Sequence, residues 1–344
     1  MHSKSTLITR YKINKISEVP QDQLSEFYKK IYNERHKSLT NNWKWWYRVG
    51  YNDSEPIIIT LDNKVIGQAA YLPEDLNILG NKVPAIWFVD YATLPEFKGK
   101  GLGKIMYKEW SKICPNQMAI CSVDSLRVLK KFGWKDNYAV KRLTKPINPL
   151  NFVPIARNLK LNFANKTLRY FMKKKYSSSV TINHYNINDN FKILNDSFNL
   201  RKKFTDNNYA TVVRDEKWLH WRLMECPYKK DIYFFEYKNN FAIAHIFFKR
   251  VKRLNILYTY STDTTYENDL YCHITNWAIS NDIDVLWAIN RSNNLKNIFP
   301  KIFNKPLKFA AWSSDEKILN ILKNGLDIQG IDTDTDSCLY EDPS

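Results

Sequence analysis

The sequence predicts a mixed α+β protein with two tandem domains, each built on a central mixed, mainly antiparallel sheet flanked by helices. Three observations lead to this prediction. Strand and helix patterns alternate in the first half around a short glycine loop, and the same order returns in the second half. The chain of 344 residues is also long enough for two domains of ordinary size. We place the first domain at residues 1–147, a basic connector at 148–176 and the second domain at 177–344.

The elements of the first half follow from local patterns. Strands are expected at residues 11–17, 56–61, 65–72, 85–94, 118–123 and 138–147, and helices at residues 21–34, 42–49, 105–112 and 125–132. Asp62-Asn63 lies between two alternating runs and indicates a hairpin, as does Gly80-Asn81 before the long apolar strand. Gly133 follows the last helix, where a C-cap glycine is common.

The second half repeats the first. Trp43-Lys44-Trp45-Trp46 corresponds to Trp218-Leu219-His220-Trp221 at an offset of 175 (218 less 43), and an apolar strand follows each motif. In the second copy we expect a hairpin at 239–240, strands at 255–261 and 284–290, and helices at 266–280 and 293–303. Because the tryptophans recur in both copies, we interpret them mainly as core, with a substrate-stacking role for one of them as the alternative.

A glycine loop in the first half is the candidate ligand site. The chain has nine glycines, and Gly99, Gly101 and Gly103 lie within five positions. The loop leads from the apolar strand into an amphipathic helix. Glycines let a phosphate approach the main chain, and a helix N-terminus favours anions. No glycine occurs between Gly133 and Gly325, so the second copy cannot repeat the loop.

The spacing excludes two common phosphate loops. A P-loop needs Ser or Thr after Gly-Lys, whereas Ile105 follows Gly103-Lys104. A dinucleotide loop needs G-x-G-x-x-G, and here the third glycine comes one residue early. A lysine-rich surface turn that begins a helix is the remaining alternative to a ligand loop.

The segment Lys98-Gly99-Lys100-Gly101-Leu102-Gly103 resembles the [Arg/Gln]-x-x-Gly-x-[Gly/Ala] pyrophosphate loop of GNAT acyltransferases. The lead-in Pro95-Glu96-Phe97 is common in that family. Lys98 stands where Arg or Gln is usual, which keeps a cation but loses the planar fork. The order of elements over residues 11–147 agrees with the GNAT topology. The resemblance implies a tandem GNAT protein with a degenerate second half, similar to enzymes of bacterial surface-polysaccharide pathways and to Fem-like aminoacyl transferases.

The resemblance also implies a co-substrate, acetyl-CoA or another acyl-CoA, and no metal. The main-chain N–H groups near residues 92–94 are expected to face the thioester. The residues expected to bind the co-substrate are Ala92, Thr93, Leu94, Lys98, Gly99, Lys100, Gly101, Leu102, Gly103 and Lys104.

Acyl transfer to an amine needs a base and an acid. Asp90 is the candidate base, because an apolar strand is expected to raise the pKa of its carboxyl; a buried donor that occupies it is the alternative. Asp124, after the next strand, is the second candidate. Many GNAT enzymes carry a tyrosine four residues before the glycine of the next helix, but Leu129 stands there. Tyr91 is the remaining candidate acid, although strand alternation points it away from Asp90; water is the alternative.

The charge balance does not by itself indicate nucleic acid. The formal net charge is +17, yet residues 137–188 contain ten Lys and Arg and no acidic residue, so the excess is concentrated in this stretch, which includes the connector. We interpret these cations as solvated, with contact to an anionic membrane surface as the less favoured alternative. The five cysteines show no metal spacing, which suits a reducing cytoplasm. Neither a spanning apolar run nor a signal peptide is expected.

The leading hypothesis is therefore an acyl-CoA-dependent N-acyltransferase, with acetyl-CoA the expected donor, transferring directly in a ternary complex. The acceptor is expected to be a small polar amine, best represented by a nucleotide-linked amino sugar. Two alternatives stay open. One is a Fem-like aminoacyl transferase that uses charged tRNA for a cell-wall precursor, and the other is a non-catalytic acyl-CoA-binding module.

Overall fold

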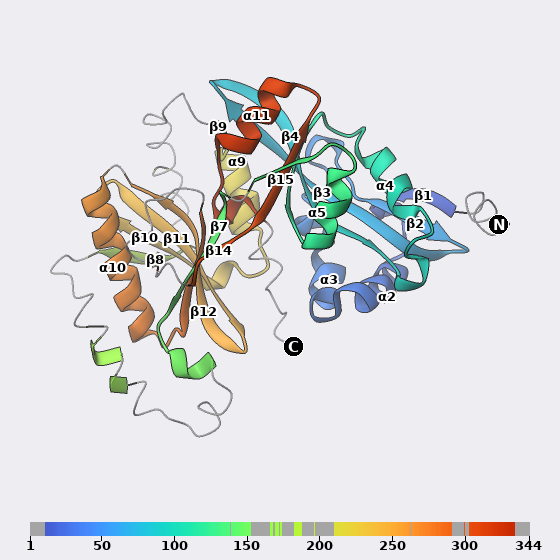
Figure 1. Ribbon diagram of the computed structural model, residues 1–344. Helices are drawn as coiled ribbons and strands as arrows, with labels where there is room; N and C mark the ends of the chain where they lie inside the picture. The colour runs from blue at the N-terminus through green and yellow to red at the C-terminus, as the bar shows by residue number, and fades with distance from the viewer. Residues whose placement is uncertain are drawn as a thin grey trace.

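The computed structural model describes residues 11–137, 139–152, 182–187, 210–261, 263–290 and 303–333, with 166–167, 169–171, 173, 196 and 299 as isolated positions. These residues form two sheets that lie side by side, each with helices against it (Figure 1). Within this part of the chain, no helix is long and apolar enough to cross a membrane.

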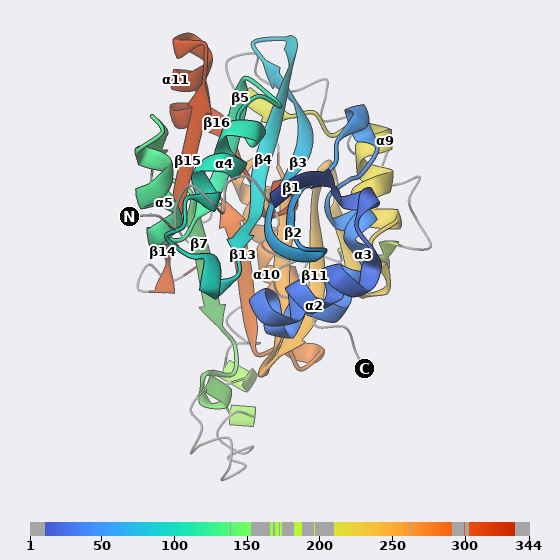
Figure 2. The ribbon, with the colours of Figure 1, turned by 90° about the vertical axis from the view of Figure 1, so that its right-hand side faces the viewer.

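The first sheet has the order β1-β2-β3-β4-β5-β15-β6, and β9 pairs with β3 and β16. Its strands are β1 (Tyr11–Lys15), β2 (Ile57–Leu61), β3 (Lys64–Ile78), β4 (Asn81–Thr93), β5 (Asn116–Cys121), β6 (Lys135–Asn137), β9 (Ala210–Val212), β15 (Lys308–Ser313) and β16 (Leu326–Asp327). Its helices are α2 (Gln21–Tyr32), α3 (His36–Trp46), α4 (Leu102–Trp110), α5 (Val123–Lys130) and α11 (Glu316–Asn324). Figure 2 shows α4 and α5 near β5 and β15, with α2 and α3 as a separate pair.

The second sheet has the order β14-β7-β13-β12-β11-β10-β8. Its strands are β7 (Lys141–Pro146), β8 (Asn183–Asn186), β10 (Ile232–Tyr237), β11 (Asn240–Lys249), β12 (Val251–Tyr260), β13 (Val285–Asn290) and β14 (Lys305–Pro306). The long helix α10 (Thr264–Ser280) covers one face, and the short helix α9 (Glu216–Leu219) with the π-helical turn His220–Met224 lies on the side of the first half (Figure 1).

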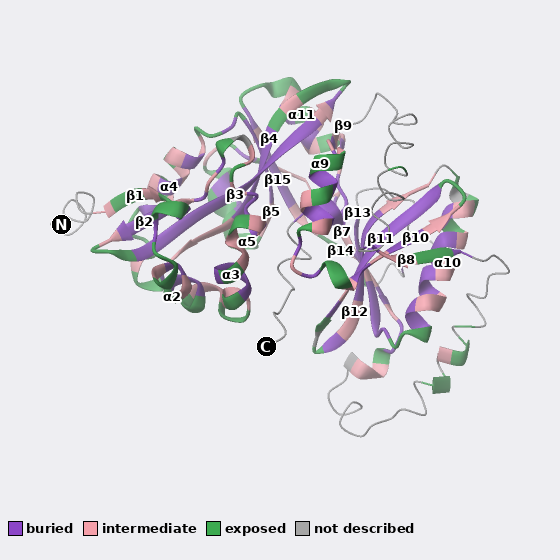
Figure 3. Ribbon diagram, turned by 180° about the vertical axis from the view of Figure 1, so that it is seen from behind, coloured by how far each residue is buried: buried purple, intermediate pink, exposed green. Residues whose placement is uncertain are grey.

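Two hydrophobic cores stabilise this arrangement. The larger core joins both halves, since Leu223 and Phe234 of the second half pack in one cluster with Leu39 and Ile58 of the first. The smaller core lies between the second sheet and α10. Figure 3 shows buried residues running along strands such as β3 and β11.

The two sheets exchange strands. β7 lies in the second sheet between β13 and β14, and β15, from near the end of the chain, lies in the first sheet between β5 and β6. The expectation that residues 138–147 close the first domain is therefore wrong, because β15 occupies that place beside β5. A boundary at residue 147 does not assign each sheet to one part of the chain, because each sheet contains strands from both sides of it. The domain bounds therefore stay a proposal.

The repeat is visible in the order of strands. β2-β3-β4-β5 and β10-β11-β12-β13 both run antiparallel until a last parallel pair. At the junction, the indole N–H of Trp45 donates to the carbonyl of Trp221 at 2.8 Å, and the indole N–H of Trp221 donates back at 3.2 Å. The offset of 175 residues aligns Trp45 with His220, whereas in the structure Trp45 contacts the next residue, Trp221. Trp46 and Trp218 are buried, as the core interpretation predicts.

Other differences are local. The helix expected at 42–49 begins earlier, at His36, and ends at Trp46. The helix expected at 293–303 and most of the basic connector lie outside the described residues.

Candidate functional site

The glycine loop forms an open set of donors at the start of α4. Gly99 and Gly101 have φ values of +76° and +88°, which residues with a side chain rarely adopt. Gly101 is the N-cap of α4 and brings no side-chain cap. Among the described residues, no hydrogen-bond partner is found for the backbone N–H groups of Gly99, Gly101, Leu102 or Gly103. Such unpaired amides at a helix N-terminus are suited to bind an anion.

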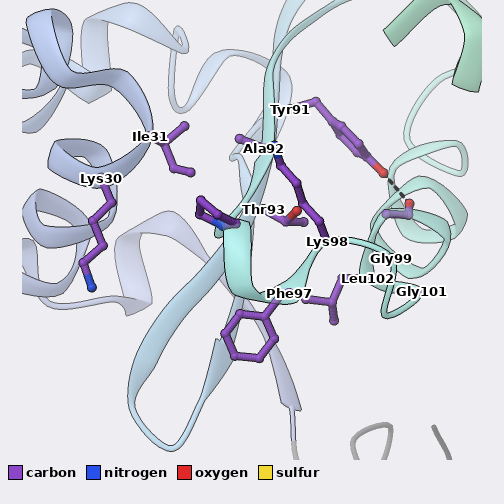
Figure 4. Close-up of a pocket in the computed structure, with 12 residues that line it drawn as sticks. Lys30, Ile31, Tyr91, Ala92, Thr93, Phe97, Lys98, Gly99, Gly101 and Leu102 are labelled. Carbon is purple, nitrogen blue, oxygen red and sulfur yellow. Dashed lines mark hydrogen bonds between the residues drawn. The ribbon is translucent and has the colours of Figure 1, made fainter. Parts of the chain in front are cut away.

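A cavity of about 490 Å³ adjoins these amides. Figure 4 shows Lys30 and Ile31 of α2 on one side of the cavity and Tyr91 of β4 on the other. The lining residues are Lys30, Ile31, Tyr91, Ala92, Thr93, Pro95, Phe97, Lys98, Gly99, Gly101, Leu102 and Gly103. The lining contains two cations, Lys30 and Lys98, and no acidic residue. Its charge and its donors therefore fit a diphosphate.

The strands beside the cavity diverge. β4 and β5 pair in parallel only at Ile86↔Gln117 and Trp87↔Met118. Beyond this point β4 carries a bulge against β3, where the register passes from Ala70↔Val89 to Gln68↔Ala92 and leaves Asp90 and Tyr91 without a ladder partner. Asp90 has a φ of +44°, which is uncommon for a residue other than glycine. Bulges of this kind are frequent next to active sites.

Side chains hold the bulge from one side. The guanidinium of Arg35 donates to both carboxylate oxygens of Asp90, at 3.0 and 3.3 Å, and the hydroxyl of Tyr47 donates to Oδ2 at 3.1 Å. The amide of Gln68 donates to the Tyr47 hydroxyl at 2.9 Å and to the Asp90 carbonyl at 3.4 Å. Tyr28 closes the network by donating to Gln68 at 2.9 Å. Asp90 is thus tied to buried donors, which was the alternative to its role as base.

Tyr91 points the other way, as strand alternation predicts. Its hydroxyl donates to the carbonyl oxygen of Gly103 at the start of α4. Burial raises the pKa of Tyr91, so the phenol stays protonated at neutral pH. Tyr107, on α4, is engaged elsewhere, because its hydroxyl accepts from the Trp134 indole at 3.2 Å.

Other predicted site residues lie apart from the cavity. Asp124 is 90% exposed and pairs with Arg127, within the same helix. The N–H of Leu94 donates to the carbonyl of Ile66 at 2.9 Å, so the expectation that it faces a thioester is wrong. Lys104 lies in the first turn of α4 and does not line the cavity, nor does Lys100, whose ammonium lies 5.0 Å from the centre of the Phe97 ring.

Sequence reasoning missed several residues of the site. Arg35 and Tyr47 are distant from Asp90 in the chain, and no local pattern connects them. Gln68 carried a signal, since it is a fully buried polar residue in the apolar run of β3. Lys30 lies on the amphipathic helix α2, and nothing in the sequence around it indicated a place in the site. No group of three or more metal-ligating side chains occurs in the described ranges.

A smaller cavity, of about 20 Å³, lies between the two halves beside Asp90. Its lining residues are Arg35, Trp45, Trp46, Tyr47, Leu72, Val89, Asp90, Trp221, Arg222 and Thr333. Three of the repeated tryptophans therefore also line a cavity that touches the bulge. In this conformation the cavity holds no more than a water-sized group.

The corresponding place in the second half is closed. β12 and β13 pair only from Arg253↔Val285 to Ile256↔Ala288, and the C-terminal segment 329–333 packs against β12 where the strands separate. The side chain of Gln329 accepts from the Thr259 N–H at 2.8 Å and donates to its carbonyl at 3.0 Å. Asp332 pairs with Arg214, and both are almost fully buried. We call segment 329–333 the plug.

Comparison with known proteins agrees with this geometry. Residues 17–134 match the model of the acetyltransferase (GNAT) family, a segment that contains the bulge, the loop and α4. No curated protein matches the chain.

Several solved structures are similar in fold. A GCN5-related N-acetyltransferase from Kribbella flavida aligns with a TM-score of 0.59 and 11% identity over 89% of this chain and 71% of that one. A GCN5-related N-acetyltransferase from Anabaena variabilis aligns with a TM-score of 0.55 and 13% identity, over 88% of this chain and 72% of that one. The N-myristoyltransferase of Saccharomyces cerevisiae, solved with bound myristoyl-CoA, aligns with a TM-score of 0.56 and 11% identity, over 88% of this chain and 78% of that one. These likenesses concern the fold; they span both halves and confirm the predicted fold class.

Proposed function

We propose that the chain is an acyltransferase of the GNAT superfamily, and that it transfers an acyl group, expected to be acetyl, from acyl-CoA to an amino group of a small polar acceptor. A nucleotide-linked amino sugar of bacterial surface-polysaccharide synthesis is the proposed acceptor. Transfer is direct, in a ternary complex of chain, acyl-CoA and acceptor. The cytoplasm is the proposed compartment.

One observation carries the proposal: unpaired amides at the start of α4 meet a cavity whose only charged groups are lysines. Backbone N–H groups and cations are the partners that a diphosphate prefers. When bound there, acyl-CoA supplies the thioester. The fit lies in the donor set, since Gly99 and Gly101 keep the main chain accessible and Lys30 and Lys98 balance the negative charge.

The residues around the bulge take separate roles in this proposal. The backbone N–H groups of Asp90 and Tyr91, which have no partner in the β3–β4 register, are the proposed donors to the oxyanion that forms on the thioester carbonyl. Tyr91 is the proposed acid for the departing thiolate, because burial keeps its phenol protonated. Asp90 positions the bulge through Arg35 and Tyr47 rather than taking a proton. No residue lining the larger cavity is a carboxylate or histidine, so water is the proposed acceptor of the amine's proton.

The first experiment tests the co-substrate. Thermal shift with CoA, acetyl-CoA and longer acyl-CoAs should stabilise the wild type, and the panel decides the acyl length. Gly101→Asp should abolish this stabilisation, since its carboxylate repels the pyrophosphate. Gly80→Asp is the matched control: Gly80 has a φ of +85° against +88° for Gly101, and neither position has an atom within 4 Å of an added Cβ. Equal stabilisation of both variants would overturn the assignment of the loop.

The second experiment tests the acceptor. A panel of nucleotide-linked amino sugars with acetyl-CoA should release free thiol with at least one member. Acyl-CoA binding without turnover of any amine would favour the non-catalytic module. Salt-sensitive RNA binding without acyl-CoA binding would favour aminoacyl transfer from tRNA.

The third experiment tests the role of Asp90. Asp90→Asn should lower kcat, leave the KM for acyl-CoA near the wild-type value, and keep the pH profile of kcat. Loss of the acidic limb of that profile, where protonation of a carboxylate base would lower kcat, would instead assign Asp90 as the base.

A further inference from the structure

Two arginines of the second sheet share one tryptophan. The guanidinium carbon of Arg142, on β7, lies 4.9 Å from the centre of the Trp287 ring, and that of Arg253, on β12, lies 4.3 Å from it. The registers Arg142↔Ile289 and Asn255↔Trp287 place all three side chains on one face, because residues two apart in a strand share a face. The alternate residues pack under α10, so this face is the one turned away from that helix.

The arginines have no countercharge among the described residues. The Nε atom of each is buried, and no residue that the structure describes is a hydrogen-bond partner of it. Burial first, and then the neighbouring charges of Arg142 and Arg250, lower the pKa of Arg253. Holding two like charges together with buried, unsatisfied donors costs free energy. Binding of an anion would offset that cost.

A solvated basic surface does not explain this arrangement. Arg142, Arg253 and Trp287 are all half-buried, and the guanidinium groups are held against a ring instead of extending into water. Lys305, exposed on β14, lies opposite Arg142 and adds a third cation. The planar forks of paired arginines match the oxygens of a phosphate.

A row of rings leads from the cavity beside Asp90 to this place. The ring-centre distances are 5.7 Å for Trp45–Tyr228, 4.2 Å for Tyr228–His245 and 5.6 Å for His245–Phe247. The guanidinium of Arg253 then lies 5.7 Å from the Phe247 ring. Tyr228, His245 and Phe247 are buried, so these rings are packed core and not an open surface. They show that the arginines lie on the same face of the second sheet as the contact with the first half, which carries the proposed reaction site.

We propose that Arg142 and Arg253 form a subsite for the phosphate or diphosphate group of the acceptor. The identity of the ligand as acceptor rests on the proposed function, whereas the subsite itself rests on the contacts of the arginines. Its ligand class is a small phosphorylated molecule whose amino end reaches the bulge.

Calorimetry with inorganic pyrophosphate and with UDP, both at saturating CoA, tests the subsite. CoA fills the glycine loop, so any further binding reports a second site. Wild type should bind both probes, and Arg142→Gln or Arg253→Gln should weaken binding by about tenfold or more, because each removes a charge-assisted donor. Lys252→Gln is the matched control: it removes a cation from β12 on the opposite face, and binding should not change.

The outcomes separate the two proposals. Failure of CoA to bind overturns the proposed function. Normal CoA binding with no pyrophosphate or UDP binding overturns the subsite and leaves the proposed function standing. Equal affinities in wild type and Arg253→Gln, with lower thermal stability of the variant without ligand, would assign the arginines a structural role and also overturn the subsite.

Discussion

The helices α4 and α10 follow corresponding strands of the two halves but begin in opposite ways. Gly101 caps α4 without a side chain, and the N–H groups of Leu102 and Gly103 have no partner among the residues that the structure describes. Asp263 caps α10, and its carboxylate accepts from the Thr265 N–H at 2.6 Å. In the second half, a carboxylate of the chain itself thus stands where the first half offers donors to a ligand. The same fold can bind an anion or satisfy its own helix, and the cap residue decides which.

The two halves also differ where the parallel strands stop pairing, beyond the β4–β5 pair in the first half and beyond the β12–β13 pair in the second. Beyond the short pairing of β4 with β5, a cavity lies between β4, the loop and α2, whereas beyond the pairing of β12 with β13 the plug packs against β12. In the second half, a piece of the chain itself therefore occupies the place that corresponds to the proposed ligand site. Four predictions test how the plug, the α10 cap and the junction of the halves contribute to stability.

The largest effect is expected at the buried ion pair of the plug. Arg214→Ala should lower the free energy of unfolding by about 3–5 kcal/mol, because it leaves Asp332 charged, buried and unpaired. Denaturant unfolding measures it. The double variant Arg214→Met, Asp332→Asn should recover a large part of the loss. A single variant as stable as wild type would show that the plug does not depend on this pair.

A pH dependence is expected at the junction of the halves. Burial raises the pKa of Glu74 to about 8 from a usual value of 4.5, and its carboxyl accepts from the Trp218 indole at 2.7 Å. Since the folded state binds the proton more tightly than the unfolded state, this group stabilises the fold at low pH.

The free energy of unfolding should therefore fall as pH rises from 4.5 to about 8, by at most about 1.4 kcal/mol per pH unit. Denaturant unfolding across this range measures the slope, and Glu74→Gln should flatten it. The same slope in both proteins would contradict the assignment to Glu74.

Gly330, in the plug, should not tolerate a side chain because a Cβ would contact its neighbours, whereas Gly99 and Gly101 of the loop have a positive φ and no neighbour within 4 Å. A Cβ on Gly330 would lie 3.2 Å from the carbonyl oxygen of Leu257, so Gly330→Ala should cost about 1–3 kcal/mol by overpacking. Gly325→Ala is the control, since its nearest contact, the Ile321 carbonyl oxygen, is at 3.4 Å and its φ is negative. Thermal unfolding compares them, and equal stabilities would show that the plug can shift.

The smallest effect is expected at the α10 cap. Asp263→Ala should lower stability by about 1 kcal/mol through loss of the bond to Thr265. It should not create a second acyl-CoA site, because the plug still fills the gap. A second equivalent of CoA bound in calorimetry would show that the cap alone excludes the ligand.

Local features were predictable from the sequence, and non-local ones were not. The glycine loop and the hairpin at Asp62 depend on neighbours in the chain, and both are found in the structure. Strand patterns carry no record of the sheet that a strand joins, so the exchange of β7 and β15 was not predicted. The pair Arg35–Asp90, 55 residues apart, could not be inferred for the same reason.

The exchange of strands has a consequence for synthesis of the chain on the ribosome. In the described structure, β6 pairs only with β15, and β5 needs β15 to cover its edge. The first sheet therefore cannot be completed until residues 308–313 have emerged, after almost the whole second half has been translated. The nascent chain exposes an open strand edge for most of its elongation, and its two halves mature together instead of one after the other.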